Sequence, residues 1–291
     1  MNQLYTGSDF SLHDHVIINS VRLNLDDLIN QDYMNQKTVR KLHETFANNK
    51  PFPHLVFEGL FSPTLLELVN SEFDSLKWGD WQSYDTSNER KFGSRPNTRF
   101  GPATQLYFNT IYSGPFVRLM TGVTGIEGLV PDPELHAGGL HEIPTGGKFA
   151  VHTDFNQHPV THLDNRLVFI TYLNKGWEAG FGGALELWCP DEDICKVAVE
   201  PVFGRSVLFY QSSRSPHGHP TPVCAPEGRT RRSAAAYFYS NGRSDGETTE
   251  FHSTVITKQI KLEGREKVVR NLKYFTPPAV VDAVRKVKGL F

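Results

Sequence analysis

The chain has 291 residues and a formal net charge of −2 at pH 7, with 30 basic and 32 acidic side chains mixed along its length. Such a charge balance gives no electrostatic case for nucleic acid or an anionic membrane as a partner. The three cysteines are odd in number and lack zinc-ligand spacing, the first 20 residues contain no hydrophobic signal region, and no apolar run approaches the roughly 20 residues of a membrane span. The sequence therefore predicts a cytoplasmic protein without a disulfide framework.

The N-terminal residues 1–50 are expected to form a helical extension, because apolar side chains recur there at loosely helical spacing. These side chains are Leu23, Leu25, Leu28, Ile29, Val39, Leu42 and Phe46. After two prolines, a short strand is expected at 54–57. A second helix is expected over residues 62–78, because Ser62 followed by Pro63 is a typical helix start.

Residues 78–103 show neither helical nor strand periodicity. They mix aromatic and basic side chains with glycine, serine, asparagine and aspartate: Trp78, Trp81, Tyr84, Arg90, Lys91, Arg95 and Arg99. Loops of this length without secondary structure of their own are often functional. This segment is interpreted either as a solvated connection or as a lid over a substrate, with Arg95 and Arg99 as candidate substrate contacts.

From about residue 134 the chain becomes rich in short aromatic and aliphatic runs separated by glycine, proline, asparagine and aspartate. The runs are 166–173, 184–188, 206–210 and 233–239. Many short strands without intervening helices predict a sandwich or barrel. One domain is expected at 51–250, with supporting helices. A strand and helical extension at 251–291 is expected to pack on the same domain.

His152 and Asp154 stand two residues apart, and on a strand such residues point to the same face. A third ligand could come from His217 or from His219, which share a strand face and follow more than 60 residues later. Two imidazoles and one carboxylate can hold Fe(II) on one face and leave the other coordination positions open for substrate-like ligands and O₂. These residues therefore predict a metal site.

A basic residue, Arg231 or Arg232, follows on the next expected strand. A guanidinium can bind a carboxylate through two parallel hydrogen bonds. Alternation places Arg231 on one face of the strand with Ser233 and Tyr237, and Arg232 on the other face. A metal site with a carboxylate clamp indicates an oxygenase that consumes a 2-oxo acid.

Several runs together resemble the prolyl-hydroxylase-like branch of the Fe(II)/2-oxoglutarate dioxygenase superfamily, over roughly residues 134–240. Besides the H-x-D motif, they are RLVFITYLNK at 166–175, GGALEL at 182–187, GRSVLFY at 204–210, SPHGHP at 215–220 and RRSAAAY at 231–237. The resemblance implies a double-stranded β-helix, which is a distorted jelly roll, mainly β with flanking helices.

The resemblance also implies roles for individual residues. His152, Asp154 and His217 match the iron ligands, and His217 is preferred to His219 because it directly follows Ser-Pro, as the family pattern prefers. Arg231 matches the residue that binds the C5 carboxylate of 2-oxoglutarate. Tyr172 matches a tyrosine that hydrogen-bonds the same carboxylate, or it is a core aromatic residue. His141 is a further candidate for substrate contact.

One departure from the family pattern is the long connection between His217 and Arg231, which the insertion at 220–230 lengthens.

The resemblance implies a hydroxylase that uses Fe(II), 2-oxoglutarate as cosubstrate and O₂, with ascorbate as a candidate reductant. It would hydroxylate an unactivated C–H bond of a small-molecule, saccharide, amino-acid or peptidyl partner and release succinate and CO₂. Two rivals are a non-catalytic jelly-roll module that binds a sugar or a metal, and a cupin-type metalloenzyme that does not use 2-oxoglutarate. Cupin sites more often contain three histidines and a glutamate. Neither nucleic acid nor a membrane is expected as a partner.

Overall fold

The structure is a computed structural model that describes residues 14–96, 98–247 and 250–258. Its strands are β1 (His15–Ile18), β2 (Val21–Asn24), β3 (His54–Glu58), β4 (Trp81–Asp85), β5 (Glu89–Ser94), β6 (Val130–Pro131), β7 (Gly139–Ile143), β8 (Lys148–Thr153), β9 (Asp164–Tyr172), β10 (Leu185–Cys189), β11 (Ile194–Val199), β12 (Arg205–Tyr210), β13 (His217–His219), β14 (Arg231–Ser240) and β15 (Val255–Lys258). Its α-helices are α1 (Gln36–Asn48), α2 (Pro63–Glu72), α3 (Pro102–Ile111) and α4 (Gly114–Thr124). Short 3₁₀ helices cover Leu25–Asp27, Gln31–Met34, Phe73–Ser75, Trp78–Asp80 and Ala179–Phe181.

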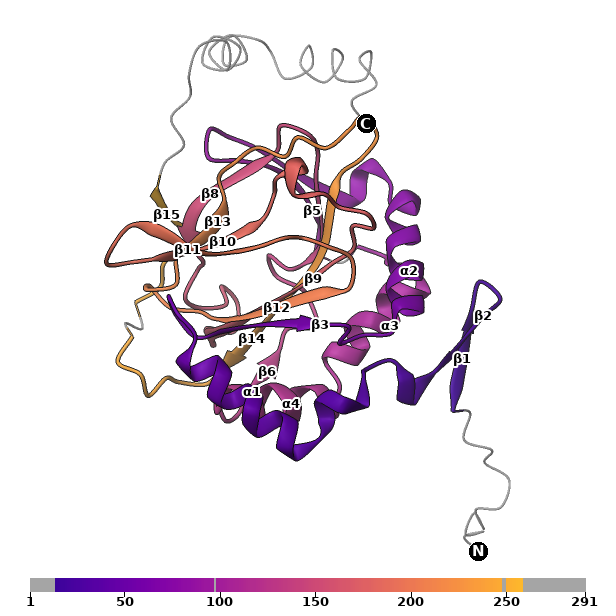
Figure 1. The fold of residues 1–291 in the computed structure, drawn as a ribbon, viewed down its shortest axis with the longest axis horizontal. Coiled ribbons are helices and arrows are strands. Elements are labelled where there is room, and N and C mark those ends of the chain that lie inside the picture. The colour runs from indigo at the N-terminus through magenta and orange to yellow at the C-terminus, as the bar shows by residue number, and fades with distance from the viewer. Residues whose placement is uncertain (1–13, 97, 248–249, 259–291) are drawn as a thin grey trace, which may run out of the picture.

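The main sheet is antiparallel and curves into a nearly closed barrel, the double-stranded β-helix that the resemblance implied (Figure 1). Strands β3, β12, β9, β14 and β7 form one half, called here the major half, and β8, β13, β10 and β11 form the minor half. Strand β5 joins the halves, because Phe92 and Gly93 pair with β7 whereas Glu89 and Arg90 pair with β8. The predicted fold class is confirmed.

Alternation along the major half separates two cores. Phe169 on β9 and Phe238 on β14 face outward and pack against Phe116 of α4. Helices α1 to α4 lie along this outer side (Figure 1). Tyr172 and Tyr237, on the same two strands, face the barrel interior and pack with apolar residues of both halves. The helices thus stabilise the major half from outside and leave its inner face to line the barrel.

The N-terminal segment differs in part from its predicted helical structure. Helix α1 contains Val39, Leu42 and Phe46, as expected, but residues 15–24 form a β-hairpin, so the helical prediction is wrong there. The physical reason is readable in the sequence. The β-branched residues Val16, Ile17, Ile18 and Val21 flank Asn19 and Ser20, whose φ angles of 51° and 64° suit a two-residue hairpin turn.

The helix expected after Ser62 is present as α2, with the Ser62 hydroxyl accepting a hydrogen bond from the Leu65 amide. Residues 78–103 are not the irregular loop that the sequence indicated. They contain the β4–β5 hairpin, in which β5 pairs with β7 of the main sheet, followed by the start of α3. Strand periodicity was hidden because polar residues occur on both faces of this hairpin.

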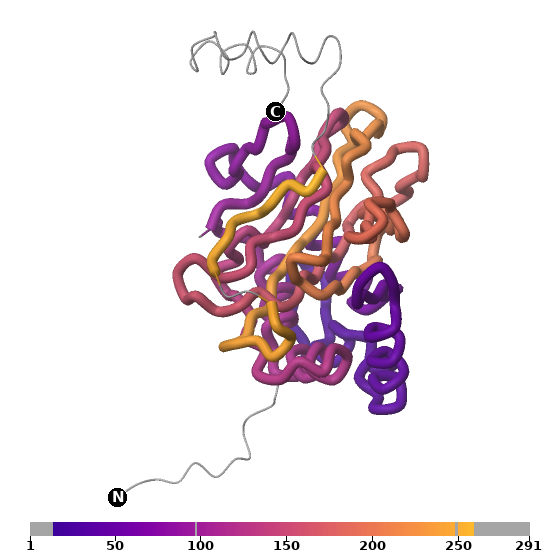
Figure 2. The backbone as a smooth tube through the Cα atoms, turned by 90° about the vertical axis from the view of Figure 1, so that its left-hand side faces the viewer, coloured from indigo at the N-terminus to yellow at the C-terminus, as the bar shows by residue number. Residues whose placement is uncertain are grey.

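The last described segment, β15, runs antiparallel to β8, and Figure 2 shows it in yellow along this side of the barrel. The expected C-terminal helices fall at 259–291, outside the described residues. Among the residues that the structure describes, no helix is long and apolar enough to cross a membrane.

Candidate metal centre

Three side chains predicted as iron ligands converge inside the barrel. His152 lies on β8, Asp154 follows the end of that strand, and His217 begins β13, directly opposite His152 in the ladder. Their ligand atoms all lie within 4.8 Å of one another, and all three side chains are buried. The Asp154 carboxylate lies 3.4 Å from His152 Nε2 and 3.6 Å from His217 Nε2. His219 does not belong to this group.

Hydrogen bonds orient both imidazoles toward the carboxylate. His152 Nδ1 lies 2.7 Å from the Ala150 carbonyl oxygen, and His217 Nδ1 lies 3.0 Å from that of Ser215. A carbonyl only accepts, so each Nδ1 carries the proton and each Nε2 presents a lone pair. The Tyr237 hydroxyl donates to Asp154 Oδ2 over 3.2 Å and orients this carboxylate. Such outer partners typically tune metal ligands.

The electrostatics favour the protonation states that a divalent cation requires. Burial lowers the pKa of His217 to about 4, and the adjacent His152 adds to this effect. Burial alone would raise the pKa of Asp154, but His217 and His152 outweigh it and hold that pKa below its usual value. At neutral pH the group therefore offers neutral imidazole and an ionised carboxylate. Two histidines and one carboxylate with open positions form the donor set of non-haem Fe(II) sites.

Arg231 is the first residue of β14 and is 4% exposed. Its Nε donates to the Gly183 carbonyl oxygen over 2.6 Å, and its Nη2 lies 3.4 Å from the Tyr172 hydroxyl, with the guanidinium over the Tyr172 ring. A Cβ on Gly183 would stand 2.8 Å from Arg231 Cδ, so glycine is needed for this approach. Among the described residues, no acidic side chain forms an ion pair with Arg231.

Arg232, one residue further along β14, has the opposite environment. It forms ion pairs with Glu142 at 3.0 Å and with Asp74 at 2.6 Å, on the helix side of the sheet. The strand alternation expected from the sequence is therefore present. Of the two arginines, Arg231 faces the barrel interior and retains free capacity to bind a carboxylate.

The β4–β5 hairpin lies next to the metal centre. Lys91 Nζ is 2.9 Å from Glu89 Oε1 and 4.2 Å from the centre of the Phe149 ring, which stacks on the His152 imidazole at 3.7 Å. His141 on β7 stands opposite Gly93 of the hairpin. Burial lowers the pKa of His141 to about 3, and Lys91 and Arg231 add to this effect, which indicates that its imidazole is neutral and close to the pocket cations.

Arg95 and Arg99 lie apart from this centre. Both are exposed, and Arg95 Nη1 donates to Gln82 Oε1 over 2.8 Å. The sequence interpretation named Tyr237 and Lys91 but assigned no site role to either residue. Tyr237 was recoverable from alternation, since it shares a strand face with Arg231, whereas Lys91 lies in the hairpin that was interpreted as a loop.

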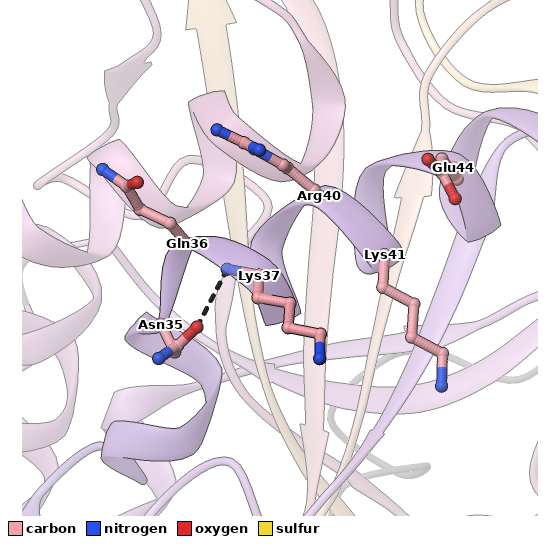
Figure 3. Close-up of a pocket in the computed structure, with 6 residues that line it drawn as sticks. All are labelled: Asn35, Gln36, Lys37, Arg40, Lys41 and Glu44. Atoms are coloured by element: carbon pink, nitrogen blue, oxygen red, sulfur yellow. Dashed lines mark hydrogen bonds between the residues drawn. The ribbon is translucent and has the colours of Figure 1, made fainter.

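A hollow of about 620 Å³ lies elsewhere, along the start of α1 (Figure 3). Its lining residues are Asn35, Gln36, Lys37, Arg40, Lys41 and Glu44. All six are exposed, and they come from one helix and its cap. None of these lining residues is buried or belongs to the metal centre.

Comparison with known proteins is consistent with this geometry. Residues 138–239 match the model of the 2OG-Fe(II) oxygenase superfamily, and this range contains His152, Asp154, His217 and Arg231. A prolyl hydroxylase from Trichoplax adhaerens, solved with a peptide fragment of the hypoxia inducible factor oxygen degradation domain, is similar with a TM-score of 0.51 and 17% identity, over 70% of this chain and 91% of that chain. A prolyl 4-hydroxylase from Phytophthora capsici is similar with a TM-score of 0.50 and 17% identity, over 77% of this chain and 68% of that chain. At these identities the likeness shows the fold. No curated protein matches the chain.

Proposed function

We propose that the chain is a 2OG-Fe(II) oxygenase, the superfamily whose model matches residues 138–239, and that it hydroxylates an unactivated C–H bond and releases succinate and CO₂. It is a 2-oxoglutarate-dependent non-haem iron dioxygenase, which uses Fe(II), 2-oxoglutarate and O₂. The proposed substrate is a small molecule, a saccharide, or an amino acid, free or within a peptide. The peptide bound to the Trichoplax neighbour is the reason for keeping the peptidyl class.

His152, Asp154 and His217 would hold the iron, which with O₂ supplies the oxidising chemistry when bound. Their support is the 4.8 Å cluster, the lone pairs directed by the two backbone carbonyls, and the carboxylate fixed by Tyr237. The part of the chain that the structure describes contains no second group of this kind.

Arg231 would bind the far carboxylate of 2-oxoglutarate, and Tyr172 would donate its hydroxyl proton to the same group. A buried charge without a counter-ion costs several kcal/mol, so a bound carboxylate would recover stability that the free protein lacks. Tyr172 is suited to this role because its oxygen accepts from Arg231, which leaves its own proton free to be donated.

The observation that carries the proposal is that one barrel holds both a three-ligand metal group and a buried arginine with no acidic partner among the described residues. A non-catalytic sugar- or metal-binding module would not need the second feature. A cupin-type enzyme that does not use 2-oxoglutarate would not need it either.

The prime substrate would enter beside the β4–β5 hairpin. Lys91 lies there, and it is connected to His152 through the Phe149 ring. His141 faces the same side of the sheet, and Arg95 and Arg99 flank the hairpin as outer candidates for substrate contact. We propose that the hairpin closes over the substrate and excludes water during the reaction.

The proposal is tested by measuring succinate after adding Fe(II) and 2-oxoglutarate to the full chain, with and without candidate substrates. Slow succinate release is expected without substrate, and the correct substrate should stimulate it and yield hydroxylated product in equal amount. Asp154→Ala is the control for free iron. If the folded, iron-loaded protein binds no 2-oxoglutarate and forms no succinate, the proposal is wrong.

A further inference from the structure

His219 is a second histidine of β13 that the metal group does not use. Gly218 and a register shift in the β13–β8 pairing lie between His219 and His217, and all three residues are buried. His219 is 5% exposed, and its Nδ1 is buried without a hydrogen-bond partner. The two clustered histidines differ, because each of their Nδ1 atoms is held by a backbone carbonyl. His219 therefore carries bonding capacity that the described protein leaves unused.

The groups around His219 are cationic or neutral donors. The charged and titratable groups that act on His219 are Arg231, Lys91, His152 and His141. A neutral imidazole carries a proton on one nitrogen that it can donate. Arg231 is also buried, and no described acidic side chain forms an ion pair with it. This side of the pocket gathers donors that an anion would satisfy.

The insertion at 220–230, which departed from the family pattern, closes this end of the pocket. Val223 is fully buried, and its side chain lies close to Gly183, against which Arg231 packs. The Val223 amide donates to the Gly147 carbonyl over 2.9 Å, and its carbonyl accepts from the Gly146 amide over 2.7 Å. The segment after His219 therefore shields Arg231 from solvent. Hydrogen bonds to a charged ligand are strengthened in such a site.

We propose that His219 is a third contact for 2-oxoglutarate, donating from its unpartnered nitrogen to the bound dicarboxylate alongside Arg231 and Tyr172. This inference rests on the proposed function. It makes His219 a cosubstrate-binding residue and not a metal ligand, and it explains a buried histidine whose Nδ1 forms no hydrogen bond in the described protein.

Calorimetric titration of 2-oxoglutarate into the Mn(II)-loaded full chain tests this role without turnover. His219→Leu keeps an apolar bulk but removes the donor, and it should weaken binding about 10- to 100-fold, as expected for one hydrogen bond to a charged group. His219→Asn retains an amide donor near the position of Nδ1 and should bind within about threefold of the wild type. Mn(II) affinity should be unchanged in both. His162→Asn, at an exposed histidine, is the matched control.

Three results would overturn the inference. Wild-type affinity for 2-oxoglutarate in His219→Leu would show that the donor is unused. Weakened Mn(II) binding in that variant would make His219 a metal ligand instead. A wild-type protein that binds Mn(II) but not 2-oxoglutarate would overturn the proposed function, and this inference with it. His219→Val also lacks the donor, and it repeats the test if the leucine variant does not fold.

Discussion

The two faces of β9 and β14 have opposite characters although they belong to the same strands. On the outer face, Phe169 and Phe238 are completely buried against the helices and present only apolar surface. On the inner face, Tyr172 and Arg231 form a cation–ring contact and retain unused hydrogen-bonding capacity, and Tyr237 donates to Asp154, a proposed iron ligand. The outer face is therefore built for stability and the inner face for binding. Substitutions on the two faces should separate these properties.

The largest effect is expected from Asp154→Ala. Three ligands are the minimal facial set for iron, so the loss of the carboxylate should reduce Fe(II) binding and succinate formation to background. The fold should be retained, since the outer core is untouched. Metal content after dialysis and succinate yield measure the loss, and circular dichroism measures the fold. Full turnover by this variant would remove Asp154 from the metal centre.

On the outer face, Phe169→Ala should lower the free energy of unfolding by about 3–5 kcal/mol, because it leaves a cavity between the sheet and α4. Urea denaturation measures this change. The protein that remains folded should keep its KM for 2-oxoglutarate. A large rise in that KM at an unchanged unfolding free energy would contradict the separation of the two faces.

Arg231→Ala should raise the KM for 2-oxoglutarate strongly, by an amount equivalent to about 2–5 kcal/mol, because it removes a desolvated, charge-assisted contact. Arg231→Lys should be intermediate, since an ammonium cannot reproduce the two-pronged contact. Arg232→Ala is the matched control, because its ion pairs lie on the helix side. Steady-state kinetics of the two alanine variants show which arginine binds 2-oxoglutarate. A larger increase in KM for Arg232→Ala would assign that role to Arg232.

The smallest effects should come from the β4–β5 hairpin. Lys91→Met should raise the KM for the prime substrate severalfold and form more succinate than hydroxylated product, because the ammonium lies against Phe149 beside the metal centre. Arg95→Ala and Arg99→Ala should act in the same direction but more weakly, since both side chains are exposed. Parallel assays of succinate and product measure the coupling. An unchanged ratio of succinate to hydroxylated product in all three variants would show that the hairpin has only a structural role.

Much of the inner face could be predicted from the sequence because it depends on short-range order. The two-residue spacing of His152 and Asp154, and the alternation that distinguishes Arg231 from Arg232, follow from strand geometry alone. The closure of the barrel could not be predicted in this way. Strand β5 pairs first with β8 and then with β7, and Lys91 lies at this switch, beside the metal centre.

The missed elements share a physical cause. The β4–β5 hairpin has polar residues on both faces, so no hydrophobic period marked its strands. The leucine spacing predicts a helix over residues 15–24, whereas the β-branched residues that flank Asn19 and Ser20 form a hairpin. The sequence offers His219 as a metal ligand because alternation alone places it on the same strand face as His217. A bulge where β13 pairs with β8 lies between His217 and His219, and such register shifts are invisible in a single sequence.

The central claim is that one barrel holds iron at His152, Asp154 and His217 and the far carboxylate of 2-oxoglutarate at Arg231. A crystal structure of the full chain with Fe(II) and 2-oxoglutarate, grown without oxygen and measured at the iron absorption edge, tests it most directly. The expected result is a single iron peak bonded to the Nε2 atoms of both histidines and to the carboxylate, with a ligand carboxylate against Arg231. Iron bound by His219, or a ligand carboxylate held by Arg232, would contradict the account.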